Sequence, residues 1–246
     1  MPPACLLVIP CYRESARLPH FLPELARRLS DAALDVSVLV VDDGSGDAEA
    51  TRLAAFVDTL RPAFPRLQPV LRMPENRGKG GAVYAGWDTA GGEQFLAFVD
   101  ADGAVPATEV VRLFDVLQEK PAPPAALYAV RVHGAGRHLS RTFVRSITGF
   151  VFRRLVHFFF PLPVPDTQCG FKIVPASAYH AFRGELREHR FCFDVELTCQ
   201  LMIHGTRVDW EPIDWHESPG SRVRPGTIRE MFLGLLRLRR RLEWGR

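Results

Sequence analysis

The stretch Phe95-Leu96-Ala97-Phe98-Val99-Asp100-Ala101-Asp102-Gly103 reads as a buried strand that ends abruptly in two carboxylates. Its first five residues are all apolar, which is typical of a strand in a parallel sheet that is covered on both faces. Two carboxylates two residues apart offer the oxygen ligands that Mg²⁺ or Mn²⁺ takes. The stretch therefore predicts a divalent-metal site at the edge of a sheet. For an isolated pair of this spacing, a solvated acidic turn is the structural alternative.

The first half of the chain alternates apolar runs with segments of helical length. The runs predict strands at Ala4–Ile9, Val36–Val41, Leu67–Leu71 and Phe95–Val99, separated by helices at Ser15–Ser30, Asp47–Leu60 and Gly80–Ala90. Strand and helix in turn favour an α/β fold, with a mostly parallel sheet and helices on both faces. In such sheets ligands bind beyond the carboxyl ends of the strands, so the polar residues there form the candidate site.

The second half shows a different pattern. It predicts a strand at Leu127–Val132, a helix at about Ser140–Phe160, a helix at Phe193–His204, a strand at Arg207–Ile213 and a final helix from about Thr227. No internal repeat or flexible linker interrupts the chain. We therefore expect a single domain over residues 1–224, with a first half at 4–103, a second half at 104–224 that completes the site, and a basic amphipathic C-terminal helix at 225–246.

The composition excludes several classes of protein. With 246 residues, 47% of them hydrophobic and 24% charged, the chain is of ordinary globular type. Its five scattered cysteines form no C-x-x-C pair, so we expect reduced, packed thiols. The N-terminus lacks the features of a signal peptide, and no apolar run has the length of a membrane span, so the sequence predicts a cytoplasmic protein. Nucleic acid is not an expected partner, because the basic residues are not interleaved with aromatic ones.

Three further motifs lie where strands end or helices begin. Ile9–Ser15 and Val40–Asp47 place acidic and aromatic side chains after the first two strands. Asn76–Ala82 is a glycine-rich basic loop that opens a helix, and the amides of a helix N-terminus together with Lys79 favour anions. The loop lacks the spacing of a P-loop. The carboxylates after the first two strands can accept hydrogen bonds from a base N–H or from ribose hydroxyls, and Tyr12 can stack on a base. The basic loop favours an anion, and helix capping explains part of the same pattern.

Taken in order, the motifs I-P-C-Y-R-E (9–14), V-V-D-D-G-S-G-D (40–47), N-R-G-K-G-G-A (76–82) and D-A-D-G (100–103) resemble family 2 glycosyltransferases, an inverting group with the Rossmann-like GT-A fold. D-T-Q-C-G-F-K (166–172), F-C-F-D-V-E-L (191–197) and W-H-E-S-P-G-S-R (215–222) resemble the dolichyl-phosphate β-glucosyltransferase and polyprenyl-phosphate glycosyltransferase branch. Mannosyltransferase relatives carry a glutamine where this chain has Ala104, which favours the glucosyl branch. The resemblance implies that residues 4–103 bind the nucleotide sugar and that 104–224 face the acceptor.

The resemblance also implies roles for individual residues. The nucleotide-sugar site would comprise Pro10, Tyr12, Glu14, Val41, Asp43, Asp100, Ala101, Asp102 and Arg222, together with Lys79 of the basic loop. Asp100 and Asp102 would hold Mg²⁺ or Mn²⁺. The catalytic residues would be Asp102, Arg131, Arg145 and Asp166, with Gln168, Asp194 and Glu196 as candidates for reading the sugar or the acceptor. A structural ion pair is the alternative for Glu196.

The implied reaction transfers a hexose, expected to be glucose from UDP-glucose, to a polyprenyl or dolichyl phosphate. Because an acceptor phosphate is already anionic, no general base is required, and Asp166 would orient the arginines or the sugar. Asp166 would act as the base if the acceptor were an alcohol, as in a soluble family 2 enzyme that modifies a saccharide. A non-catalytic nucleotide-sugar-binding module is a further alternative, against which the intact pairs Asp100/Asp102 and Arg131/Arg145 argue.

Two segments bear on attachment to a membrane. Ile228–Trp244 places apolar residues at helical spacing with arginines opposite them, a pattern of helices that lie in the lipid headgroup region. A stripe that faces the protein core is the alternative, and Phe158–Phe160 leaves the same choice open. We expect a peripheral protein at the cytoplasmic face of a membrane, reached through this helix or through a partner membrane protein.

Overall fold

The strands of the first half are apolar on both faces, as β1 (Cys5–Cys11) shows. Leu7 and Ile9 belong to one cluster of buried side chains, whereas Leu6 and Val8 belong to another. Successive side chains of a strand point to opposite faces of the sheet, so each face of this strand needs its own cover of helices. All five cysteines are buried and none forms a disulfide.

The main sheet of the computed structural model, which describes residues 4–120, 124–132, 139–140, 152–216 and 225–242, has the strand order β3-β2-β1-β4-β7-β5-β8. Besides β1, its strands are β2 (Val36–Asp42), β3 (Leu71–Arg72), β4 (Phe95–Val99), β5 (Ala126–Val130), β7 (Phe171–Pro175) and β8 (Val208–Pro212). β7 runs antiparallel to β4 and β5, and the other pairs in this sheet are parallel. The predicted mostly parallel sheet is confirmed.

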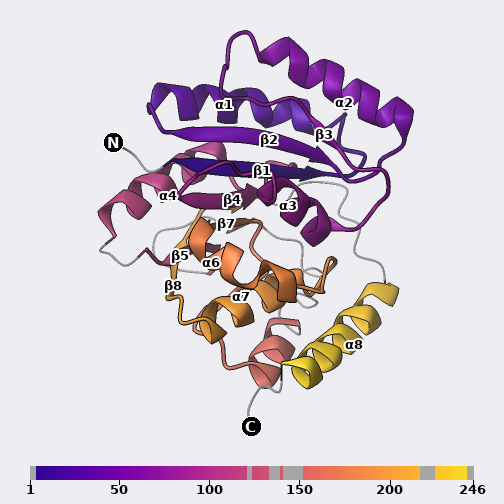
Figure 1. Cartoon of the computed structure of the whole chain (residues 1–246), viewed down its shortest axis with the longest axis vertical. Coiled ribbons are helices and arrows are strands. Elements are labelled where there is room, and N and C mark those ends of the chain that lie inside the picture. The colour runs from indigo at the N-terminus through magenta and orange to yellow at the C-terminus, as the bar shows by residue number, and fades with distance from the viewer. Residues whose placement is uncertain (1–3, 121–123, 133–138, 141–151, 217–224, 243–246) are drawn as a thin grey trace.

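Helices cover both faces of this sheet (Figure 1). The cluster on one face includes side chains from α1 (Leu22–Asp31), α2 (Asp47–Leu60) and α4 (Ala107–Glu119). The cluster on the other face includes side chains from α3 (Lys79–Trp87), α6 (Ala176–Phe182) and α7 (Phe193–Ile203). Two short 3-10 helices, η1 (Leu18–His20) and η2 (Arg183–Glu185), complete these connections. The predicted α/β architecture is therefore also confirmed.

Several elements differ from the sequence prediction. The helices α4 and α6 were not predicted, and the strand expected at Leu67–Leu71 is observed as β3 at Leu71–Arg72. The strand β7 was not predicted, because Phe171–Pro175 follows a turn-rich segment and is short. The helix expected at Ser140–Phe160 is helical at residues 152–159, whereas β6 (Leu139–Ser140) is a strand paired with β9 (Trp215–His216). Residues 141–151 lie outside the described residues.

The C-terminal helix α8 (Pro225–Arg241) packs on the protein with one face. Leu235 and Leu238 are fully buried in a third cluster together with Phe152 and Val156, and Figure 1 shows α8 beside the helical segment 152–159, far from α1 and α2. The apolar stripe of α8 is thus core-facing along this part of the helix. Within the described part of the chain, no helix is both long and apolar enough to cross a bilayer.

Candidate functional site

The carboxyl ends of neighbouring parallel strands meet at one edge of the sheet, as the motifs predicted. β1 lies between β2 and β4, and Pro10 is opposite Val41 in the register of β1 and β2. The amide of Asp43 donates to the carbonyl of Cys11 at 2.7 Å. This bond joins the end of β2 to the end of β1, so the polar residues that follow both strands begin from backbone that is held in place.

Glu14 is held by an arginine that the sequence analysis did not single out. Arg17 Nε lies 2.7 Å from Glu14 Oε2, and the pKa of Arg17 is raised, mainly by this hydrogen bond and in spite of burial, with a contribution from Asp102. The i, i+3 spacing of the two residues was the available signal. Tyr12 is half-buried, and the guanidinium of Arg13 lies 5.2 Å from the centroid of its ring.

Asp43 anchors the glycine-rich loop that precedes α3. Its carboxylate accepts hydrogen bonds from the amide of Arg77 at 2.7 Å, the amide of Gly78 at 2.9 Å and Nδ2 of Asn76 at 2.9 Å. Burial raises the pKa of Asp43 and outweighs these bonds, which favour the ionised form. Gly78 has φ +90°, and a Cβ there would lie 2.6 Å from the carbonyl oxygen of His189, so the turn into α3 requires a glycine.

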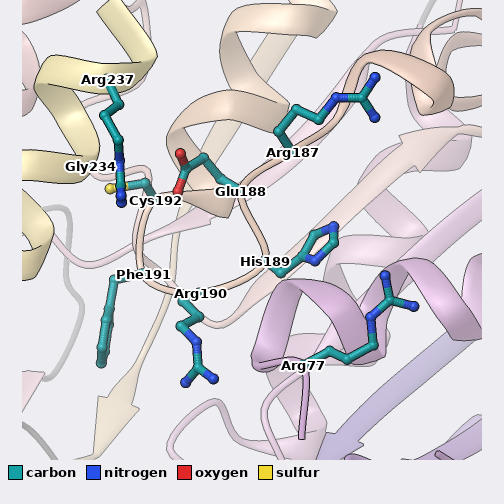
Figure 2. Close-up of a pocket in the computed structure, with 9 residues that line it drawn as sticks. All are labelled: Arg77, Arg187, Glu188, His189, Arg190, Phe191, Cys192, Gly234 and Arg237. Carbon is teal, nitrogen blue, oxygen red and sulfur yellow. The ribbon is translucent and has the colours of Figure 1, made fainter. Parts of the chain in front are cut away.

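The first amides of α3 are already engaged by the protein backbone. Gly80 N and Gly81 N both donate to the carbonyl of His189, at 2.8 and 3.3 Å, and Figure 2 shows the chain at His189 lying against the start of this helix beside Arg77. The sequence had assigned these amides to an anionic ligand. The structure assigns them to His189, so a ligand at this loop would be met by side chains such as that of Lys79 and not by these two amides.

The predicted metal ligands Asp100 and Asp102 both follow the end of β4. The amide of Asp100 donates to the carbonyl of Gly170 at 2.9 Å, and a Cβ on Gly170 would lie 2.2 Å from Asp100 Oδ2. Asp102 Oδ1 accepts from the amide of Ala104 at 3.0 Å, while Ala101 between the two carboxylates is buried. The pKa of Asp102 is raised, first by burial and then by the charge of Asp100.

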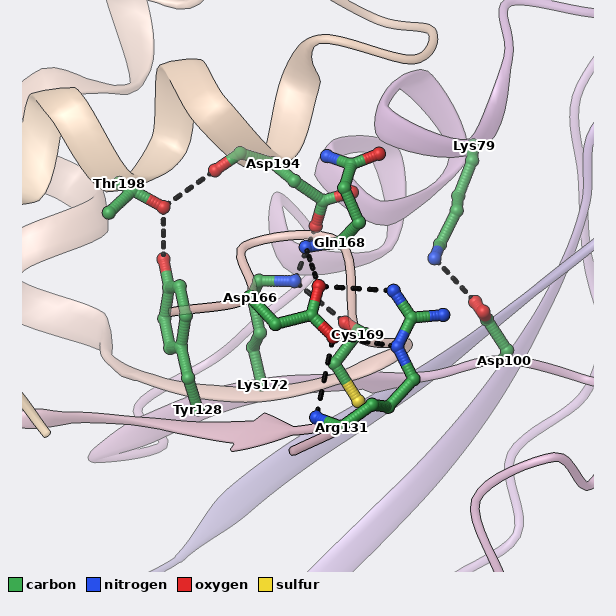
Figure 3. A network of polar contacts seen from close by, with 10 residues as sticks. All are labelled: Lys79, Asp100, Tyr128, Arg131, Asp166, Gln168, Cys169, Lys172, Asp194 and Thr198. Atoms are coloured by element: carbon green, nitrogen blue, oxygen red, sulfur yellow. Dashed lines mark hydrogen bonds and ion pairs between the residues drawn. The ribbon is translucent and has the colours of Figure 1, made fainter. Parts of the chain in front are cut away.

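Lys79 supplies a positive charge at this position. Its Nζ lies 2.6 Å from Asp100 Oδ1 and 4.9 Å from the centroid of the Phe98 ring, and Figure 3 shows the ammonium group directed at the carboxylate. Burial alone would lower the pKa of Lys79, but the charges of Asp100 and Asp194 outweigh it and the pKa is raised. Lys79 is therefore a cation that neutralises Asp100.

The two carboxylates fit an open metal site. Among the described residues no group of three or more His, Cys, Asp and Glu side chains could hold a metal ion, so a site at Asp100 and Asp102 would need further ligands from a substrate. Mg²⁺ is commonly bound in this way, through one or two carboxylates plus phosphate oxygens. The pKa of Asp102 is raised first by burial and then by the negative charge of Asp100, and the Lys79 ammonium beside Asp100 shows that the position accepts a cation.

Arg131 and Asp166 form a forked pair beyond the end of β5. Arg131 Nε lies 2.7 Å and Nη2 3.1 Å from the two carboxylate oxygens of Asp166, and the guanidinium lies 5.5 Å from the ring centroid of Trp215. Burial would raise the pKa of Asp166, but Arg131 and Arg153 outweigh it and hold the pKa well below its usual range. Asp100 in turn contributes to raising the pKa of Arg131, so the forked pair and the carboxylates of β4 share one field.

Asp194 is paired inside the protein with Lys172, which the sequence analysis did not consider. Lys172 Nζ lies 2.5 Å from Asp194 Oδ1 and 2.8 Å from the carbonyl of Cys169, and its side chain is fully buried (Figure 3). Gln168 differs, because its buried Nε2 has no hydrogen-bond partner in the structure as described. Of these residues, Gln168 is the one that offers a free donor to a sugar or an acceptor.

Glu196 is buried and connects two segments. Its carboxylate accepts hydrogen bonds from the amides of Arg187 and Glu188, at 3.0 and 2.6 Å, and forms an ion pair with Arg241 of α8. Burial is the largest influence on its pKa, which is raised in spite of these partners. The contacts favour the structural ion pair that the sequence left open for Glu196.

The remaining predicted residues, Arg145 and Arg222, lie outside the described residues. The structure thus brings Lys79, Asp100 and Asp102 together at the donor edge and sets the Arg131–Asp166 pair within the same field. The assignment of all these side chains to substrates stays a prediction.

Comparison with known families identifies the chain. The family model described as "Glycosyl transferase family 2" matches residues 6–182, which is most of the chain. The protein belongs to glycosyl transferase family 2. This family 2 glycosyltransferase is 32% identical over 228 residues to the dolichyl-phosphate beta-glucosyltransferase of Homo sapiens, an alignment that covers 89% of the chain and 69% of the relative. Identity to the dolichyl-phosphate beta-glucosyltransferase of Saccharomyces cerevisiae is 29% over 229 residues, covering 88% and 68%.

Solved structures confirm the GT-A fold of the transferase. A glucosyl-3-phosphoglycerate synthase from Mycobacterium tuberculosis, in complex with Mn²⁺, uridine diphosphate and phosphoglyceric acid, matches with a TM-score of 0.69 at 16% identity, covering 98% of this chain and 78% of the other. A mannosyltransferase from Pyrobaculum calidifontis in complex with GDP-Man and Mn²⁺ matches with a TM-score of 0.63 at 15% identity, covering 100% and 71%. At this identity the likeness establishes the fold.

Proposed function

We propose that this transferase moves a glucosyl residue from a nucleotide diphosphate sugar, expected to be UDP-glucose, to a polyprenyl or dolichyl phosphate. An oxygen of the acceptor phosphate would form a bond to the anomeric carbon as the bond from that carbon to the donor diphosphate breaks, which inverts the configuration. The relatives named dolichyl-phosphate beta-glucosyltransferase support the lipid phosphate acceptor, and the strand-end carboxylates support the donor.

The ionised state of Asp166 favours an anionic acceptor over an alcohol. A general base for an alcohol works best with a pKa near the working pH. Asp166 instead has a pKa held well below its usual range, because Arg131 binds both of its oxygens. A carboxylate in that state is a poor proton acceptor but a good positioner of an arginine. An acceptor that is already anionic needs the arginine and not the base.

The side chains around the carboxylates have complementary tasks in this proposal. A Mg²⁺ or Mn²⁺ ion on Asp100 and Asp102 would neutralise charge on the leaving diphosphate. Lys79 would add a second positive charge there, and Arg131, kept in one orientation by Asp166, would place its positive charge at the acceptor phosphate. Gln168 would donate its unpaired Nε2 to a hydroxyl of the sugar or to the acceptor.

Matched acceptors test this function. The protein is incubated with UDP-glucose and Mn²⁺, and with either a polyprenyl phosphate or the polyprenol of the same chain length, and glucosylated lipid is measured by mass spectrometry. We expect transfer to the phosphate and none to the alcohol. Transfer to polyprenol or to a saccharide, but not to the phosphate, would establish the alternative with an alcohol acceptor. Donor binding without transfer to any acceptor would establish a non-catalytic module.

The outer face of α8 supports attachment to the cytoplasmic surface of a membrane. Phe232 and Leu233 of α8 are exposed, with 39% and 43% of their surface accessible, and Phe158 of the helical segment 152–159 is 76% exposed. Arg239 and Arg240 also lie on α8. Apolar residues beside arginines suit the headgroup region of an anionic membrane. Changing Phe232 and Leu233 to serine should lower binding to anionic vesicles and leave the fold intact. Unchanged vesicle binding would assign membrane contact elsewhere, for example to a partner membrane protein.

A further inference from the structure

A basic cavity adjoins the donor edge, because Arg77, which lines it, donates its amide to Asp43, and the charge of Arg190, another lining residue, acts on the same carboxylate. The cavity has a volume of about 500 Å³ and is lined by the segment 187–192, by Arg77 before α3 and by Gly234 and Arg237 of α8 (Figure 2). None of the residues assigned above to the nucleotide sugar, the metal or the acceptor lines it. Three separate parts of the chain thus enclose a space for which the proposed reaction has no use.

The charges in this cavity are strongly unbalanced. Its lining includes four arginines, at positions 77, 187, 190 and 237, against one carboxylate, that of Glu188. The pKa of His189 is lowered, first by burial and then by the charges of Arg77 and Arg187, so this imidazole adds no charge near neutral pH. Within the part of the chain that the structure describes, Arg77, Arg190 and Arg237 form no ion pair with a carboxylate.

The contact between α8 and the segment 187–192 is close enough to fix the shape of the cavity. A Cβ at Gly234 would lie 2.5 Å from Cys192 Sγ, so the glycine lets the helix approach Cys192 and brings Arg237 to the wall. On the other side, the carbonyl of His189 is bound by the first amides of α3. The arginines are therefore carried by backbone that is held in place.

We propose that this cavity binds a phosphate monoester or diphosphate group at a site that adjoins the donor edge but shares none of the residues assigned to it. Planar guanidinium groups bind phosphate oxygens in pairs, and the volume is in the range of small-ligand sites. Phe191, which lines the cavity, is 38% exposed. Phe232 and Leu233 are also exposed, and they precede Gly234 directly on α8. The phosphate can therefore come from a free metabolite or from the headgroup of a membrane lipid.

Titration with inorganic pyrophosphate tests the phosphate chemistry. Binding is measured by calorimetry in the presence of a chelator, on the full chain and on Arg190→Gln, Arg237→Gln and Arg240→Gln. Arg240 is an exposed arginine of the same helix that does not line the cavity, so its variant is the matched control. We expect about tenfold weaker binding for each of the two cavity variants and no change for the control. Equal affinity of all four proteins, or no binding by any, would overturn the proposal.

Vesicles then distinguish the two sources of the phosphate. Phosphatidylcholine vesicles are prepared with phosphatidic acid or with phosphatidylserine at the same surface charge. If the phosphate belongs to a lipid, Arg237→Gln should weaken binding to phosphatidic acid more than binding to phosphatidylserine. If the phosphate belongs to a free metabolite, Arg237→Gln should weaken pyrophosphate binding as above but should affect the two kinds of vesicle equally. Equal weakening by Arg237→Gln and Arg240→Gln on both lipids and on pyrophosphate would mean a diffuse attraction and would overturn the site. None of these readouts depends on sugar transfer, so they stand apart from a failure of the proposed function.

Discussion

Asp100 of the first half and the two carboxylates of α7 in the second half are held in opposite ways. Asp100 at the donor edge keeps 34% of its side chain exposed and faces a lysine that is itself partly exposed. Asp194 and Glu196 of α7 are almost completely buried and bind partners within the protein. A carboxylate in a sequence motif can therefore serve a ligand or support the fold, and burial and partners separate the two cases. Substitutions should follow this division, with effects on turnover in one region and on stability in the other.

The largest effect is expected from Asp194→Asn. It leaves the fully buried ammonium of Lys172 without its counter-ion, and breaking a buried pair in this way costs about 3–5 kcal/mol. The free energy of unfolding, measured in urea, should fall by this amount, while turnover per folded molecule changes little. The double change Lys172→Met with Asp194→Leu should restore much of the stability, because it removes both charges. An Asp194→Asn protein of normal stability that has lost transfer would assign Asp194 to the substrate instead.

Asp102→Asn tests the other region. The carboxylate is needed to balance charge at the leaving diphosphate, so we expect transfer to fall by about 10²–10³-fold with little change in the unfolding transition. Circular dichroism and the activity of the purified protein with UDP-glucose and Mn²⁺ provide the measurement. Full activity of this variant, or full wild-type activity after exhaustive chelation, would remove the metal role from the donor edge.

Gly170→Ala should displace Asp100 at the donor edge, although Gly170 itself lies in the second half of the chain. The new Cβ would lie 2.2 Å from Asp100 Oδ2, so the carboxylate must leave its position. A displacement of this size can lower turnover by up to about 100-fold. Gly184→Ala is the matched control, because a Cβ there meets nothing within 4 Å. Equal activity of the two variants would show that the position of Asp100 is not critical.

The smallest effect is expected for Lys79. Its ammonium group lies against Asp100, where a divalent ion would bind. A divalent ion must displace its ammonium group, so Lys79→Gln should tighten Mn²⁺ binding without nucleotide by about two- to fivefold, the range for a partly exposed pair. Calorimetry or electron paramagnetic resonance of Mn²⁺ measures this. Arg77→Gln removes a nearby charge that does not contact Asp100 and controls for long-range effects. Mn²⁺ binding that is unchanged or weaker in Lys79→Gln would show that the lysine does not compete.

The sequence predicted the fold well where strands are apolar on both faces. Phe95–Val99 is buried throughout, and in Val36–Val41 Ser37 alone is partly exposed, so both the strands and their helical cover could be inferred. The strand β7 could not, because its antiparallel place between β4 and β5 depends on long-range pairing that no local pattern encodes. The sequence predicted α2 at Asp47–Leu60, and the structure has the same bounds. Gly46, with φ +92°, immediately precedes the helix.

The candidate site was predicted in part for a similar reason. Motifs that follow strands, such as Asp43 and Asp100, could be placed at one edge from the topology of a parallel sheet alone. Some partners could not be predicted, because they lie far away in the sequence. Gly170 meets Asp100 where β7 pairs with β4, and Lys172 of β7 meets Asp194. The role of His189 was missed as well, since it acts through its backbone carbonyl and not through its side chain.

The carboxylate of Glu196 has a consequence for motion within the molecule. It binds the amides of Arg187 and Glu188 and the guanidinium of Arg241 at once, so α8 and the segment before α7 are joined through one buried group. We expect the two segments to open together as one cooperative unit. Hydrogen exchange should then give a similar free energy of opening for both, and a contact that raises it in α8 should raise it at residues 187 and 188 as well, beside the start of α3.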